Sequence, residues 1–182
     1  LVVENGNYTD GGGVHVKNGP AHLEHLHIRN NQAENKGGGI YLWYSENYDN
    51  YHENENEFHV LSNLIISGNS ISGNDNNDRG GGVYIKDSGT SGNRVSLNYL
   101  TLYGNSSNGS GGALYLRNSN VELKNSILWQ DDPDEVGFHV QSGYSDLAIE
   151  SCIISGGVPE PGSNGEVEAE NVSDIDPEFN DP

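Results

Sequence analysis

The chain has 182 residues, with 8 Lys or Arg against 27 Asp or Glu, so its formal net charge is −19. This charge excludes nucleic acid and anionic lipid as partners, because both are bound through positive charge. No apolar run approaches the roughly 18 residues of a membrane-spanning helix, so we expect no membrane insertion by this segment.

Short segments of the form apolar–x–apolar–x–x–Asn recur along the chain. Full copies lie at residues 26–31, 64–69 and 100–105, and partial copies lie at 2–5, 126–131 and 152–157. We expect Asn5, Asn31, Asn69 and Asn105 to form structural turns, because asparagine tolerates left-handed backbone conformations. Stacked one above another, their amides can also hydrogen-bond along a column.

A second set of segments alternates with the first and begins with two or three glycines. Its copies read "GGGVHV", "GGGIYL", "GGGVYI" and "GGALYL". Gly39, Gly82 and Gly112 are expected to form tight corners, because glycine accepts strained backbone conformations. Alternation then predicts the inward pairs Val14/Val16, Ile40/Leu42, Val83/Ile85, Leu114/Leu116 and Phe138/Val140. It leaves an outward column made of His15, Tyr41, Tyr84, Tyr115 and His139.

The spacing of these segments predicts the fold. The last two copies of the first set start at residues 126 and 152, so one unit spans about 26 residues and holds three short strands. A propeller blade needs about 40 residues, and no segment has helical periodicity. We predict an all-β right-handed parallel β-helix of about five to six coils over residues 1–155. An acidic, Pro- and Gly-rich C-terminal tail or cap follows at 156–182.

The repeated phrases resemble those of a known group of proteins. "GGGI", "GGGV" and "GGAL", with "IRNN", "ISGN" and "LYGN", resemble the repeats of polymorphic outer-membrane-protein-like bacterial surface proteins. The ending "DIDPEFNDP" is similar to the close of β-helix regions in large secreted proteins, many from Bacteroidetes, that carry a separate C-terminal anchor. The resemblance implies an extracellular or bacterial cell-surface location. Because such coils carry adhesins as well as polysaccharide-cleaving enzymes, it does not choose between them.

Aromatic residues supply the candidate ligand-binding sites. Tyr41, Tyr84 and Tyr115 form the expected outward column, and Trp43 and Tyr44 open a long aromatic and acidic insertion at residues 43–59. Sugar rings stack on aromatic faces, and insertions on rigid scaffolds often carry binding function. The structural alternative for the column is aromatic pairing between strands, which stabilises a sheet.

One acidic turn is a candidate metal site. Asp131, Asp132, Asp134 and Glu135 are close together in the chain, and Ca²⁺ favours clustered carboxylates on a turn. Solvated surface charge is the alternative interpretation. We expect no other cofactor. The single Cys152 lies in an apolar alternating run and is expected to be a buried small residue.

The sequence favours a non-catalytic role, because the repeat sets no pair of carboxylates across one groove for acid–base chemistry. We expect a stalk or adhesin-like segment. The alternatives are a carbohydrate-binding module that uses the tyrosines and the 43–59 insertion, and a polysaccharide lyase or glycoside hydrolase. Expected partners are a glycan or another cell-surface protein, with end-to-end or lateral self-association through exposed strand edges. Ile65, Ile127 and Ile153 lie on one outward face, which suggests that a long loop, the C-terminal tail or another domain covers it.

Overall fold

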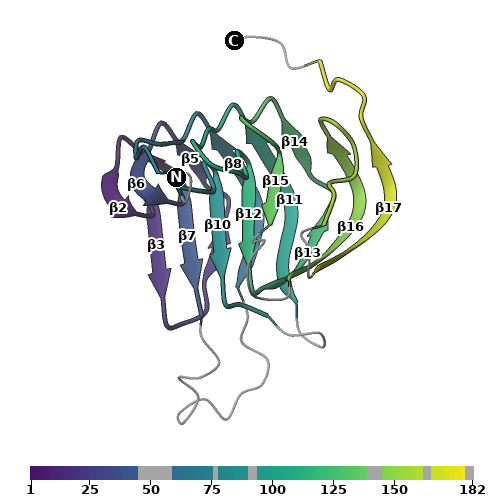
Figure 1. The fold of residues 1–182 in the computed structure, drawn as a ribbon, viewed down its shortest axis with the longest axis horizontal. Coiled ribbons are helices and arrows are strands. Elements are labelled where there is room, and N and C mark those ends of the chain that lie inside the picture. Colours follow the sequence, from purple (N-terminus) through teal and green to yellow (C-terminus); the bar gives the residue numbers. More distant parts are fainter. Residues whose placement is uncertain (45–58, 76–77, 90–93, 139–144, 162–164, 179–182) are drawn as a thin grey trace.

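The computed structural model describes residues 1–44, 59–75, 78–89, 94–138, 145–161 and 165–178. Within these ranges every regular element is a β-strand, and all paired strands run parallel (Figure 1). They do not include a helix long and apolar enough to cross a membrane. The predicted right-handed parallel β-helix is confirmed. Most of the 43–59 insertion lies outside the described residues, as do His139 and Val140.

Three sheets form the walls of the coil. The five-stranded sheet has the order β15 (Val136–Phe138), β12 (Leu114–Arg117), β10 (Val83–Lys86), β7 (Ile40–Trp43) and β3 (Val14–Lys17). The small sheet has the order β2 (Asn7–Asp10), β6 (Gln32–Lys36) and β9 (Ser70–Ile71). The nine-stranded sheet contains β1 (Val2–Glu4), β4 (His22–Glu24), β5 (His27–Arg29), β8 (Val60–Ser67), β11 (Val95–Tyr103), β13 (Asn120–Lys124), β14 (Ile127–Trp129), β16 (Ser145–Ile154) and β17 (Gly165–Ser173).

Left-handed residues turn the large sheet through a corner in each coil. In β11 the inward residues are Val95 and Leu97 before the corner and Leu100 and Leu102 after it. Tyr99, with φ of 55°, shifts the alternation by one residue at that point. The apolar side chains therefore keep pointing into the bore while the strand changes direction.

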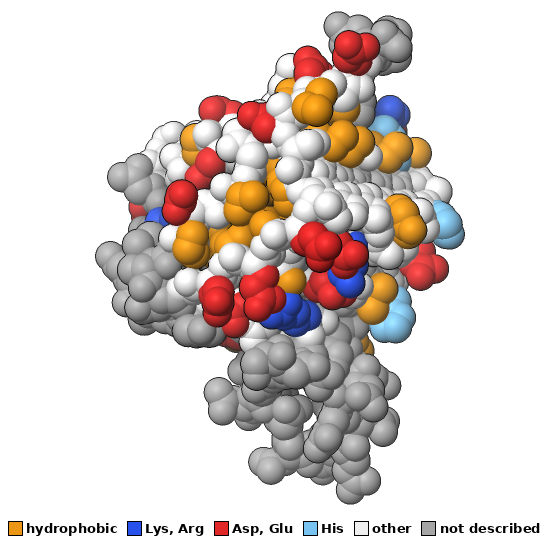
Figure 2. Space-filling model, turned by 90° about the vertical axis from the view of Figure 1, so that its right-hand side faces the viewer, with side chains coloured by type: hydrophobic (Ala, Val, Ile, Leu, Met, Phe, Trp, Pro, Cys, Tyr) orange, Lys and Arg blue, Asp and Glu red, His pale blue; other side chains and the backbone are white. Residues whose placement is uncertain are grey.

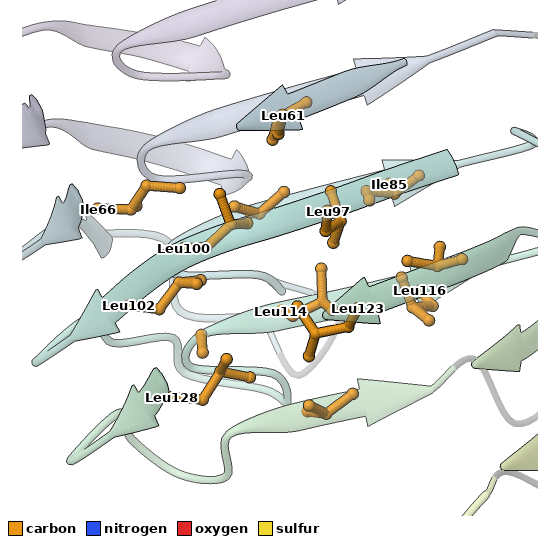
Figure 3. Packing of buried hydrophobic residues seen from close by; sticks show 14 of the residues in the cluster. Leu61, Ile66, Ile85, Leu97, Leu100, Leu102, Leu114, Leu116, Leu123 and Leu128 are labelled. Atoms are coloured by element: carbon orange, nitrogen blue, oxygen red, sulfur yellow. The ribbon is translucent and has the colours of Figure 1, made fainter. Parts of the chain in front are cut away.

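The apolar residues stack in register inside the bore. Leu61, Leu97, Leu123 and Ile149 are neighbours in successive coils, and none is more than 2% exposed. Figure 3 shows the first three among the packed leucines and isoleucines. Burying each such side chain contributes about 1.5–3 kcal/mol. Cys152 is buried in the same cluster, as predicted, and burial raises the pKa of its thiol.

The asparagine turns differ by one residue from the prediction. The left-handed residues are Asn30, Gly68 and Gly104. Each comes directly before the asparagine of its repeat, which is Asn31, Asn69 or Asn105. In the first coil the register of Val2 with His27 aligns Gly6 with Asn31. Asn5, with φ of 60°, therefore corresponds to Asn30.

The glycine corners are required mainly by close packing between coils. A Cβ on Gly81 would lie 2.5 Å from the carbonyl oxygen of Ser106, and one on Gly38 would lie 2.4 Å from that of Gly81. Gly39 and Gly82 occupy equivalent positions directly before β7 and β10, as expected, because the Gly82 carbonyl accepts hydrogen bonds from the N–H groups of Gly39 and Ile40. Gly112 is instead equivalent to Gly81, because Val83 pairs with Leu114, and the Gly112 carbonyl accepts a hydrogen bond from the Gly82 N–H at 2.8 Å.

Gly81→Ala should therefore lower the free energy of unfolding by about 2 kcal/mol, because the added methyl forces backbone apart in a packed wall. Urea denaturation measures the loss. Gly19→Ala is the matched control, because no atom lies within 4 Å of its Cβ position. Equal effects at the two positions would contradict the packing argument.

The last strand of the five-stranded sheet is shifted from its predicted register. Val136, Gly137 and Phe138 pair with Leu114, Tyr115 and Leu116. Val136 and Phe138 are the inward residues here, so Phe138 is the second inward residue of the strand rather than the first, whereas the predicted positions of His139 and Val140 lie outside the described residues. Gly137 resembles the glycine that precedes the other strands, but here it takes the column position itself. The reason is a shorter corner between Asp131 and Val136 than between Asn105 and Leu114.

The C-terminal tail adds one more strand to the rod. In β17, Gly165 pairs with Ser145 and Ser173 pairs with Ile153, so the strand continues the parallel stacking of β16. Val167 and Val172 pack against the apolar core. The sheet thus extends into the predicted tail, past the boundary at residue 155.

Candidate functional site

An asparagine ladder runs along the corner of the coils. The side-chain Nδ2 of Asn31 donates to Oδ1 of Asn69, and Nδ2 of Asn69 donates to Oδ1 of Asn105, each at 2.9 Å. The backbone N–H of each donor residue also donates to the same oxygen at 3.0 Å. The predicted column of hydrogen-bonded amides is confirmed for these residues.

The ladder ends on two buried carboxyl groups. Asp131 Oδ1 accepts hydrogen bonds from the backbone N–H of Asn105 at 2.6 Å and from its Nδ2 at 2.7 Å. The Asp131 N–H donates to Oε1 of Glu135 at 3.3 Å. Both residues are only 8% exposed. Burial raises the pKa of Asp131 to about 6, and burial together with the neighbouring Asp131 raises the pKa of Glu135 to about 9.

The other two candidate calcium ligands are directed elsewhere. Asp132 is exposed and forms a backbone bridge with Ser106. Asp134 accepts hydrogen bonds from the Ser110 hydroxyl at 3.0 Å and from the Gly111 N–H. In the part of the chain that the structure describes, His, Cys, Asp and Glu form no group of three or more suited to a metal ion. Ca²⁺ binding at this turn stays a prediction.

The tyrosine column is a buried stack on the outside of the bore. The ring centroids of Tyr41 and Tyr84 are 5.5 Å apart, and those of Tyr84 and Tyr115 are 5.2 Å apart, with nearly parallel planes. The three residues are 5%, 1% and 0% exposed. His15 packs on Tyr41 at 4.8 Å, and Arg79 donates to the Tyr115 hydroxyl at 3.0 Å. Burial raises the pKa of Tyr84 to about 12.

The tyrosines point away from the bore, as expected, but all three are buried, and their role in ligand binding stays a prediction. Each ring that a sugar would need is covered by a neighbouring ring or side chain. The geometry is that of the structural alternative, in which aromatic pairs stabilise the sheet.

Trp43 and Tyr44 also make internal contacts. The ammonium groups of Lys17 and Lys86 lie 4.4 and 4.1 Å from the centroid of the Trp43 ring. They come from β3 and β10, the strands on either side of β7, so the ring lies between two cations. The Tyr44 ring meets His59 edge-on at 6.1 Å. The structure thus joins Trp43 to the face that carries the tyrosine stack.

A second outward surface carries apolar and aromatic side chains, of which only the isoleucines were predicted from the sequence. Ile65, Thr101, Ile127 and Ile153 are neighbours in successive coils, and Ile65 is 48% exposed. Tyr103 and Trp129 are paired in register in the adjacent column and are half-buried. We call these residues the apolar strip. The sequence signal was the outward phase of the three isoleucines; the flanking aromatic pair was missed.

The surface around β16 and β17 is acidic. Figure 2 faces this end of the molecule, where Asp and Glu side chains predominate over Lys and Arg. Lys124 contacts Glu122 at 2.9 Å and Glu150 at 3.1 Å, and Arg94 contacts Glu168 at 3.2 Å. These are exposed pairs, which contribute little to stability. They form a charged face, on which Glu122, Lys124, Glu150, Glu168 and Glu170 line a hollow of about 300 Å³.

Comparison with known proteins connects this architecture to one repeat family. Residues 26–42 and 99–117 match the Chlamydia polymorphic membrane protein repeat. The match and the parallel sheets agree with the expected polymorphic outer-membrane-protein-like β-helix and with a cell-surface location. No curated protein and no solved structure matches the chain. The Bacteroidetes origin and the C-terminal anchor stay predictions.

Proposed function

We propose that this chain is a rigid, non-catalytic segment of a bacterial cell-surface protein, with a stalk or adhesin-like role. The observation that carries the proposal is the internal use of three of the repeated columns. The apolar residues fill the bore, the asparagines bond to one another, and the tyrosines stack. The repeated residues thus serve the rod itself, and the match to a surface-protein repeat supports its location.

Stiffness follows from the direction of these columns. Each runs along the rod axis and joins one coil to the next, at the spacing of about 4.8 Å between neighbouring strands. Bending the rod would strain the asparagine ladder, the tyrosine stack and the backbone hydrogen bonds together. Such a body suits holding another part of a protein away from the cell, or presenting one face to a partner.

A carbohydrate-binding module is the second candidate, and the apolar strip is the observation that favours it. Tyr103 and Trp129 are paired in register on neighbouring strands, and they are less buried than the tyrosine stack. Aromatic faces of this kind stack against sugar rings. The candidate glycan surface therefore moves from Tyr41, Tyr84 and Tyr115 to this strip.

The proposed role predicts that purified chain releases no unsaturated or reducing sugars from acidic or neutral polysaccharides. Product release would overturn the non-catalytic assignment. Glycan binding that is lost in Trp129→Ala, but kept in Tyr8→Ala, would establish the binding module instead. Tyr8 is a suitable control because it is 64% exposed and lies on a different sheet.

A further inference from the structure

One outward face of the rod lies between two corners of the nine-stranded sheet. In each of four successive coils a left-handed residue opens this face, and a second one closes it five residues later. The segments that they bound are 63–68, 99–104, 125–130 and 151–156, which are joined by pairing in register. None of these segments contains Asp, Glu, Lys or Arg. We call this surface, which includes the apolar strip, the uncharged face.

The absence of charge is local to this face. Just before the corner, the outward positions of the same sheet carry Glu122 and Lys124 in β13 and Glu150 in β16. The whole chain has 27 Asp or Glu against 8 Lys or Arg. An acidic ligand would be repelled by these surroundings, and a cationic one would be drawn to the neighbouring carboxylates instead. The uncharged face therefore suits a ligand without charge.

The side chains on the uncharged face combine aromatic rings with amide groups. Tyr99 is 55% exposed, and Tyr103 and Trp129 are half-buried on paired strands. Asn125 and Gln130 are exposed residues at the two corners of one coil. Aromatic rings offer apolar contact to the C–H faces of sugars, and amides donate and accept hydrogen bonds as sugar hydroxyls do. This combination of groups is suited to a carbohydrate.

The size of the uncharged face favours a glycan over a protein partner. Four coils at a spacing of about 4.8 Å, each with six residues of about 3.3 Å, cover on the order of 300 Å². A stable protein interface needs about 800 Å² on each partner, so a second copy or another folded protein would gain too little contact. Two copies would also bring together chains that each have a net charge of −19.

We propose that the uncharged face binds an uncharged polysaccharide across neighbouring coils. Tyr103 and Trp129 contact the sugar rings, and the amides of Asn125 and Gln130 bond to sugar hydroxyls. Such binding rests on the carbohydrate-binding function given above as the second candidate and narrows its ligand class, whereas the stalk role does not depend on it. Because no ion pair holds the ligand, its affinity should change little with salt concentration.

Isothermal titration calorimetry tests the proposal with β-glucan, galactomannan and dextran as uncharged probes and with alginate and polygalacturonate as acidic ones. At least one uncharged probe should bind, with the same Kd at low and high NaCl, and the acidic probes should not. Trp129→Ala, which removes a ring, and Thr101→Glu, which adds a carboxylate beside Ile65 and Ile127, should each weaken binding by about tenfold or more. Ser62→Glu is the matched control, because it adds the same charge to β8 on the other side of the corner.

Four contrary outcomes are distinct, provided that thermal unfolding shows each variant to be folded. Binding of an uncharged probe that survives in both Trp129→Ala and Thr101→Glu would overturn the site but leave the carbohydrate-binding function standing. Binding of acidic probes alone would overturn the ligand class. Binding of no probe would refute the site and the carbohydrate-binding function together, and would leave the stalk role intact. Wild-type dimers in sedimentation velocity, lost in Thr101→Glu but kept in Ser62→Glu, would assign the face to a second copy instead.

Discussion

Asn69→Ala should lower the free energy of unfolding by about 4 kcal/mol. Asn69 is fully buried, and its Oδ1 accepts two hydrogen bonds from Asn31 while its Nδ2 donates to Ile28 and Asn105. Removing the amide leaves several buried polar groups in adjacent coils without partners, and each costs about 1–3 kcal/mol. Urea denaturation followed by circular dichroism measures the change.

Asn98→Ala is the matched control for this ladder prediction. Asn98 is a partly exposed outward residue of β11, and its Oδ1 accepts a single exposed hydrogen bond from Asn125. Its replacement should cost under about 1 kcal/mol. A comparable loss in both variants would mean that the buried ladder contributes no more than an ordinary surface amide.

Tyr84→Ala should cost about 3–4 kcal/mol, because it removes the central ring of the buried stack and leaves a cavity between Tyr41 and Tyr115. Because the ring is buried, its removal should lower the free energy of unfolding and not only weaken ligand binding. Chemical denaturation compares Tyr84→Ala with Tyr8→Ala, whose exposed ring should matter little. A stable Tyr84→Ala chain would show that the ring is a surface platform after all.

The architecture was predictable because a parallel coil repeats each environment. Leu26, Leu64 and Leu100 recur with their asparagines since each must fill the same bore and meet the same neighbour. Burial of the tyrosines was not predictable in this way. Alternation places Tyr84 outside the bore, but what covers an outward ring depends on contacts such as Arg79 on Tyr115, which come from outside the strand.

Strand register was the second feature that the sequence did not predict. Gly137 resembles a corner glycine but is paired with Tyr115 of the tyrosine column. Asn5 resembles an asparagine of the ladder but corresponds to Asn30, one residue before the ladder position. Stacking of apolar residues and hydrogen bonds between coils determines register, whereas a local phrase does not. Asp131 was recognised as a decayed asparagine position, but only the direction of the hydrogen bonds explains why an acceptor ends the ladder.

Surface labelling of intact cells tests the central claim most directly. Antibody raised against the folded chain should stain intact cells of the source organism as strongly as permeabilised ones, and external protease should abolish the staining. This result is expected of a rigid rod on the outer surface. Staining that requires permeabilisation and resists external protease would contradict the proposed role.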